Sequence, residues 1–140
     1  MFKKMLSPDV WSEKALDWAS LILRLSLGGL MLLQHGYPKF MSIVDGNMGF
    51  ADPFGIGAPA SLAFTVLAEF ICSILIILGL GTRLASIPLI ATMLVVVFVI
   101  HLHDGMEKQE HGLVYLLPFI ALLFMGSGKF SLDAILNRNK

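Results

Sequence analysis

Residues 66–80 read VLAEFICSILIILGL, an apolar run in which Glu69 is the only charged side chain. No other charged residue occurs between Pro53 and Thr82, so the apolar stretch extends in both directions. A helix needs about 20 predominantly apolar residues to cross a bilayer core of about 30 Å. The stretch therefore predicts a transmembrane helix that carries one carboxylate within the membrane.

Similar stretches of low charge occur elsewhere in the 140-residue chain. Hydrophobic residues make up 56% of the sequence and charged residues 14%, whereas soluble domains average about 45–50% and about 25%. A soluble domain of this length could not bury so much apolar surface. We expect an all-α fold, an integral membrane four-helix bundle that forms a single domain over residues 1–140. The predicted spans lie near residues 18–37, 60–80, 84–102 and 111–126.

The distribution of lysine and arginine predicts the side of the membrane on which each segment lies. The first and third loops contain only Lys39 and Lys108. The two terminal segments and the second loop contain Lys3, Lys4, Lys14, Arg83, Lys129, Arg138 and Lys140. Because positive residues favour the cytoplasmic side, we expect a multi-pass protein with both termini in the cytoplasm (N-in/C-in).

Two segments outside the spans also have an expected structure. Ser7-Pro8-Asp9 is typical of a helix start, since serine caps a helix and proline suits its first position. Residues 8–17 are therefore expected to form a short N-terminal helix at the membrane interface. The loop from Lys39 to Pro59 combines glycine and proline with aromatic side chains, and we expect it to cover the outer end of the bundle or to enter the headgroup region.

Two further counts restrict the function. The formal net charge is zero, which gives no indication of a nucleic-acid partner. Cys72 is the single cysteine, so the chain has no internal disulfide and no cysteine pair. A membrane thiol oxidase needs such pairs to pass electrons, so the sequence argues against that activity.

Arg24 and Glu69 are the charged residues within the predicted spans. A charge at the centre of a spanning helix costs about 2.5–3.5 kcal/mol, so a paired arrangement is favourable. With antiparallel spans, the two residues differ in depth by about 8 Å, which a long arginine side chain can largely cover. We expect Arg24 and Glu69 to form an ion pair or to share a water molecule, an arrangement that either holds two helices in register or belongs to a functional pocket.

Histidines are expected to gather at the outer ends of the spans. They are His35, His101, His103 and His111, with Tyr115 one helical turn deeper than the last. His101 and His103 would point to nearly opposite sides of a helix, and we predict no metal site. The candidate catalytic residues are Glu69, Arg24, His35 and His101, and the candidate cofactor-binding residues are Arg24, His35 and Tyr115.

Four pieces of the sequence, in this order, resemble the DoxX family of small bacterial membrane proteins. They are LILRLSLGGLMLLQHGYPKF (21–40), AEFICSILIILGLGTRLASIPL (68–89), a histidine near the end of the third span, and GSGKFSLDAIL (126–136). The residues that match the family pattern are Arg24, His35, Gly36, Lys39, Glu69, Gly79, Leu80, Thr82, Arg83, His101, Gly126, Gly128, Ser131 and Asp133. Pro38 and Lys129 depart from it.

The resemblance implies a four-helix protein of the bacterial inner membrane that is linked to oxidoreduction. Some members of the family resemble the membrane subunits of thiosulfate:quinone oxidoreductase, and others anchor redox or detoxification complexes. A quinone is therefore the expected cofactor, with its ring hydrogen-bonded by Arg24, His35 or His101 and its protons relayed by Glu69 or a histidine. A partner redox subunit would supply the electrons.

Two other classes of function are compatible with the sequence. The first is a non-enzymatic membrane anchor or assembly protein, in which the polar residues have a structural role. The second is a subunit of a small proton or ion transporter, which four short helices could form as a homo-oligomer. In every case the lipid bilayer is the first partner.

Overall fold

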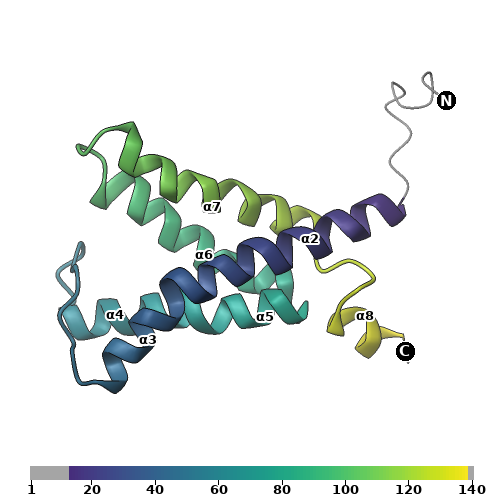
Figure 1. Cartoon of the computed structure of the whole chain (residues 1–140), viewed down its shortest axis with the longest axis horizontal. Coiled ribbons are helices and arrows are strands. Elements are labelled where there is room, and N and C mark those ends of the chain that lie inside the picture. Colours follow the sequence, from purple (N-terminus) through teal and green to yellow (C-terminus); the bar gives the residue numbers. More distant parts are fainter. Residues whose placement is uncertain (1–12, 139–140) are drawn as a thin grey trace.

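The computed structural model describes residues 13–138, and this part of the chain contains helices and connecting turns but no β-strand (Figure 1). The all-α prediction is thereby confirmed over these residues. In chain order the elements are α2 (Glu13–Met31), η2 (Leu32–Gly36), α3 (Tyr37–Val44), α4 (Ala58–Val66), η3 (Leu67–Cys72), α5 (Ser73–Leu78), α6 (Thr82–Val95), η4 (Val96–Ile100), α7 (Met106–Met125) and α8 (Leu132–Asn137). The η elements are π-helical turns that continue the neighbouring α-helices.

Three continuous helices are long and apolar enough to cross a membrane. They are Glu13–Val44 (32 residues), Ala58–Leu78 (21 residues) and Thr82–Ile100 (19 residues), and they correspond to the first three predicted spans. α7 lies at the position of the fourth predicted span, but Glu107, Lys108 and Glu110 occupy its first turns. Its apolar part, residues 112–125, is shorter than the about 20 residues of a typical span, and the fourth span stays a prediction.

The first helix is longer than the sequence suggested, because it continues past Pro38 to Val44. In an α-helix, a proline ring clashes with the carbonyl group four residues earlier. Here the π-helical turn η2 ends at Gly36, two residues before Pro38, and its wider backbone relieves that clash. The connection to α4 is therefore the α3–α4 loop, residues 45–57, instead of the longer loop expected from Lys39 to Pro59.

The buried core lies where α6 packs along α7 and where α2 packs against α5 and α7. A cluster of apolar side chains at these contacts is fully buried: Met31, Ile76, Leu89, Phe119 and Leu122. Gly112 allows α7 to approach η4, since a Cβ atom at this position would overlap the side chain of Val97. Lipid tails are as apolar as this core, so close packing contributes more to helix association here than the hydrophobic effect.

The described chain begins and finishes at the same end of the molecule. Figure 1 shows the start of α2 and the short helix α8 at one end, and the α3–α4 loop and the α6–α7 turn at the other. We refer to these as the tail end and the loop end. Of the interfacial helix predicted for residues 8–17, residues 8–12 lie outside the described part of the chain, and residues 13–17 form the first turns of α2.

Candidate functional site

Glu69 forms an ion pair with Lys39. Glu69 lies in η3 and is only 1% exposed, and the Nζ group of Lys39, from α3, donates to its Oε2 atom. A carboxylate buried this deeply would be strongly disfavoured without a charged or hydrogen-bonding partner. Lys39 keeps some contact with its surroundings, because 24% of its side chain is exposed. The pair is thus a charged centre just below the surface of the loop end.

Arg24 does not contact Glu69, and the predicted ion pair between them is wrong. The buried guanidinium of Arg24 donates from Nη2 to the carbonyl oxygen of Phe130 at 2.5 Å and from Nη1 to that of Ile77 at 3.3 Å. Ile77 lies 77 − 69 = 8 residues beyond Glu69, which is about 12 Å along a helix. The difference in depth is therefore not bridged, and Arg24 belongs to the tail end.

A cavity of about 250 Å³ lies above the Lys39–Glu69 pair. Its walls come from α4, α6, η4 and the α3–α4 loop. Most of the lining is apolar, including Phe50, Phe54 and Phe64, and the hydroxyl residues Ser61, Thr65 and Thr92 also line it. Phe54 is 64% exposed and Phe64 68% exposed, so the rim of the cavity is apolar and accessible from the surroundings. We call it the loop-end cavity.

Asp52 fixes the α3–α4 loop over this cavity. Its carboxylate accepts hydrogen bonds from the N–H of Gly57 at 2.8 Å, the N–H of Ile56 at 3.0 Å and the hydroxyl of Ser61 at 3.0 Å. These hydrogen bonds, with that of Gly57 the strongest, hold the pKa of Asp52 below its usual 3.8. The ionised carboxylate thus joins the loop to the first turn of α4.

His35 and Tyr115 lie beside the Lys39–Glu69 pair, although they do not line the cavity. The two rings meet edge to face, with their centroids 5.3 Å apart. His35 directly precedes Gly36, whose backbone packs against that of Glu69, so both rings lie near the pair. The structure therefore brings these three predicted site residues, Glu69, His35 and Tyr115, into one neighbourhood.

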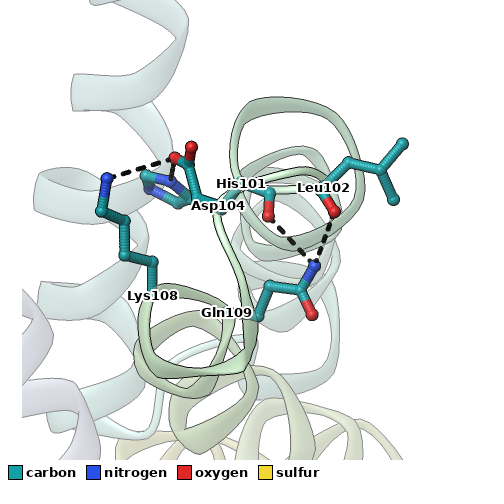
Figure 2. A network of polar contacts seen from close by, with 5 residues as sticks. All are labelled: His101, Leu102, Asp104, Lys108 and Gln109. Atoms are coloured by element: carbon teal, nitrogen blue, oxygen red, sulfur yellow. Dashed lines mark hydrogen bonds and ion pairs between the residues drawn. The ribbon is translucent and has the colours of Figure 1, made fainter.

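His101 is part of the turn between η4 and α7 (Figure 2). Its Nδ1 atom lies 2.8 Å from the Oδ2 atom of Asp104, and Lys108 contacts the same oxygen at 3.5 Å. Gln109 donates to the carbonyl oxygens of His101 at 3.0 Å and Leu102 at 3.2 Å. The hydrogen bond with His101, followed by the charge of Lys108, lowers the pKa of Asp104. These contacts indicate that His101 stabilises the turn, and it does not line the loop-end cavity.

At the tail end, the segment after α7 folds back against α5 and α6. The N–H of Gly81 donates to both carboxylate oxygens of Asp133 at 3.0 Å, and the N–H of Asp133 donates to the carbonyl oxygen of Gly79 at 3.1 Å. Gly79 has a φ angle of 69°, which glycine adopts without strain. Ser131 caps α8 by accepting from the N–H of Ala134 at 3.2 Å. Four residues that match the family pattern therefore make structural contacts at the tail end: Arg24, Gly79, Ser131 and Asp133.

The arrangement of histidine and acidic side chains bears on metal binding. Within residues 13–138, no three His, Cys, Asp or Glu side chains come together in a way that would hold a metal ion. The four histidines lie at the loop end, as expected, but His101 pairs with Asp104 whereas His35 packs on Tyr115.

Lys39 is the charged residue of the site that was not among the candidate residues chosen from the sequence. It is one of the residues that match the family pattern, but the sequence analysis placed it in the loop from Lys39 to Pro59. Two signals could have identified it: Lys39 lies at the same membrane end as Glu69, and it is spaced four residues from His35, on the same helix face. Thr65 and Thr92 were also not selected, because single hydroxyl residues are common in transmembrane helices.

Comparisons with known proteins agree with the pattern of motifs. The DoxX family model matches residues 19–102. The uncharacterized membrane protein Rv3486 of Mycobacterium tuberculosis is 32% identical over 135 residues, which cover 80% of this chain and 78% of that protein. An uncharacterized protein of Haemophilus influenzae is 32% identical over 114 residues, which cover 74% of this chain and 80% of that protein. No solved structure gives a significant match.

The family match covers more than half of the chain, and three helices of the structure can span a membrane. This chain is a membrane protein and belongs to the DoxX family.

Proposed function

We propose that this protein is the membrane subunit of a quinone-linked oxidoreductase, and that the quinone ring binds in the loop-end cavity above Lys39 and Glu69. The observation that carries the proposal is a largely apolar cavity that ends on a buried ion pair. Ligand sites commonly combine apolar walls with a few polar groups that orient the ligand. Ionisable residues inside a membrane are functional candidates by default.

The size of the cavity supports a single ring as its occupant. Its volume of about 250 Å³ lies just below the range of about 300–1,000 Å³ that is typical of small-molecule sites. A macrocycle such as haem is too large for it, whereas a benzoquinone or naphthoquinone ring is of suitable size. The exposed rings of Phe54 and Phe64 at the rim suit a ligand whose isoprenoid tail stays in the lipid.

The polar groups suit the chemistry of a quinone. Two-electron reduction converts each of the two carbonyl groups into a hydroxyl group and consumes two protons. Lys39 donates a hydrogen bond to one ring oxygen, and Glu69 transfers protons to the ring. His35 and Tyr115, which lie beside the pair, connect it to the surface of the loop end. The two electrons come from a partner redox subunit.

We further propose that the protein spans the bacterial inner membrane four times, with both termini in the cytoplasm. The position of α7 supports a fourth crossing, because the hydroxyl of Ser20 near the start of the first helix donates to the carbonyl oxygen of Gly126 after α7 at 2.8 Å. α7 thus returns to the level at which the first helix begins. The excess of lysine and arginine in the terminal segments and the second loop favours the cytoplasm for that side.

Native mass spectrometry of the protein released gently from its own membrane tests the function. We expect a bound quinone and a co-released redox subunit. The variants Glu69→Gln and Lys39→Met should lose the quinone, whereas Arg83→Lys, at the tail end, should keep it. A partner protein without quinone would indicate an anchor or assembly protein, and would contradict the proposal. A homo-oligomer that carries only lipid would also contradict it and would direct attention to proton uptake in proteoliposomes.

A further inference from the structure

Three hydroxyl groups line the loop-end cavity, and the proton of each is already used in a hydrogen bond. Ser61 donates to the Oδ1 atom of Asp52 at 3.0 Å, Thr65 donates to the carbonyl oxygen of Ser61 at 2.8 Å, and Thr92 donates to the carbonyl oxygen of Pro88 at 2.9 Å. A hydroxyl group has one proton and two acceptor lone pairs. With the proton committed, each group can only accept a hydrogen bond from a ligand.

The charged pair adds one donor and one further acceptor. The Nζ group of Lys39 donates to the Oε2 atom of Glu69, and the other oxygen of Glu69, Oε1, has no hydrogen-bond partner among residues 13–138. Lys39 has remaining N–H bonds, and its ammonium group lies 5.9 Å from the centroid of the Phe50 ring. The walls therefore present several acceptors and a single donor side chain.

Several backbone groups around the cavity cannot donate to a ligand. The N–H groups in the interiors of α4 and α6 are used within the helices, as in any regular helix. Pro53, which lines the cavity from the α3–α4 loop, has no N–H. The carboxylate of Asp52 accepts the N–H groups of Ile56 and Gly57. The side chains that line the cavity thus present mainly hydrogen-bond acceptors to a ligand.

We infer that the loop-end cavity binds the dihydroxy, reduced form of a quinone ring more tightly than the oxidised dione form. This inference rests on the proposed function and deepens it. A hydroquinone donates both hydroxyl protons, to Glu69 or the threonines, and accepts from Lys39. A dione offers only lone pairs, so Lys39 is the only side chain of the lining that can donate to it, and the side-chain acceptors face its second oxygen without a donor.

The expected discrimination follows from the cost of unpaired polar groups. A site that hydrogen-bonds the hydroxyl group of its ligand rejects an analogue without that hydroxyl, because the polar groups of the site lose their partners. We expect the hydroquinone to bind at least about tenfold more tightly than the quinone. For a two-electron couple, a tenfold preference for the reduced form raises the midpoint potential of the bound ring by about 30 mV, which favours its reduction by a partner.

The test uses the full-length protein in lipid nanodiscs under anaerobic conditions. Dissociation constants are measured calorimetrically for a short-chain benzoquinone, for its hydroquinone and for the dimethyl ether of that hydroquinone, and binding to empty nanodiscs is subtracted. The dimethyl ether keeps the ring and its oxygens but has no hydroxyl proton. We expect tight binding of the hydroquinone, with the quinone and the ether at least about tenfold weaker.

Single substitutions show which side chain causes the preference for the hydroquinone. Thr92→Val removes one acceptor and should reduce the ratio of the two affinities about threefold or more, whereas Thr92→Ser should retain it. Ser26→Ala is the matched control, because Ser26 also donates to the carbonyl oxygen four residues earlier, that of Ile22, but lies on an exposed part of α2.

The outcomes separate the two proposals. If the quinone binds as tightly as the hydroquinone or more tightly, the inference is wrong and the proposed function stands. If Thr92→Val weakens both forms equally, the hydroxyl acts through shape and the inference is also wrong. If neither form binds beyond the empty nanodiscs, both proposals fail.

Discussion

The backbone of Gly36 packs directly against the backbone of Glu69. A Cβ atom at position 36 would overlap the carbonyl group of Glu69 and would lie 2.8 Å from the Cα atom of Phe70. Gly36 ends the π-helical turn η2, and Glu69 lies in the π-helical turn η3, so the two irregular turns meet at this contact. Glycine therefore determines how closely the first helix approaches the residue at the floor of the cavity.

Gly36→Ala should separate these two turns and destabilise the protein. The neighbouring atoms belong to the backbone and cannot rotate away, so we expect a loss of about 3 kcal/mol in the free energy of unfolding, the upper part of the range for overpacked cores. SDS titration of the purified protein would measure it. The control is Gly29→Ala on the same helix, where a Cβ atom would have no neighbour within 4 Å. That control should be neutral or slightly stabilising. Equal stability of both variants would contradict the close contact.

Lys39 and Glu69 should be energetically coupled. Lys39→Met leaves a carboxylate that is only 1% exposed without its partner, and breaking a buried pair in this way costs about 3–5 kcal/mol. The double variant Lys39→Met/Glu69→Gln removes both charges and should recover most of that loss. A double-mutant cycle in SDS would measure the coupling.

Lys108→Met provides the comparison for this cycle, because Lys108 also pairs with an acid but its side chain is 62% exposed. Its effect should stay below about 1 kcal/mol. A cycle without coupling between Lys39 and Glu69 would mean that the two side chains do not interact in the membrane. A stable double variant that no longer binds quinone would assign the pair a functional role beyond helix packing.

The burial of Glu69 and Arg24 could be predicted from the sequence, but their partners could not. Both residues lie within long apolar runs, so their side chains had to face other helices. Lys39 was assigned to the loop that follows the first span, whereas the helix continues through the π-helical turn η2 and past Pro38, which brings Lys39 to Glu69. Such a turn leaves no clear mark in the pattern of apolar residues.

The contacts of Arg24 show a second limit of sequence interpretation. Its guanidinium binds the carbonyl oxygen of Phe130, 106 residues away, and backbone carbonyl groups occur at every position of a chain. The cavity also depends on residues far apart in the sequence, since its lining combines three helices with a loop whose path depends on Asp52. Residue type and spacing predicted the helices and the polar neighbourhood, whereas three-dimensional packing decided which polar groups meet.

Arg24→Lys should loosen the tail end and leave the loop-end cavity intact. A lysine cannot reproduce the two-sided contacts that the planar guanidinium makes with Phe130 and Ile77. We expect a loss of about 1.5–3 kcal/mol, typical of hydrogen bonds to charged groups. Trypsin should then cleave faster after Lys129, and mass spectrometry would follow that cleavage.

Arg83→Lys is the control for the tail end. Its Nη2 atom also donates to a backbone carbonyl oxygen, that of Phe124 at 3.2 Å, but the side chain lies on the surface. Both substitutions keep a basic residue, so the number of tryptic sites does not change. Equally fast cleavage of both variants would show that Arg24 does not hold the tail segment.

The α3–α4 loop should stay ordered at neutral pH and loosen in acid because of Asp52. Its folded-state pKa is lowered below 3.8, mainly by the hydrogen bond from Gly57. A lowered pKa means that the ionised form stabilises the fold, so this contribution is complete above about pH 3.8 and is lost as the pH falls through the folded-state pKa. Hydrogen exchange of the Ile56 and Gly57 amides, corrected for intrinsic rates, should show constant protection between about pH 5 and 7 and a decrease below about pH 4.

Asp52→Asn should remove this pH dependence, because an amide has only one acceptor oxygen for the three donors that Asp52 binds. Protection of the two amides should then be low at every pH. Asp45→Asn is the matched control, since Asp45 lies in the same loop and is exposed, and it should behave like the wild type. If Asp52→Asn keeps full protection, then apolar contacts, not the carboxylate, hold the loop over the cavity, and a ligand that enters from the lipid would have to displace those contacts instead.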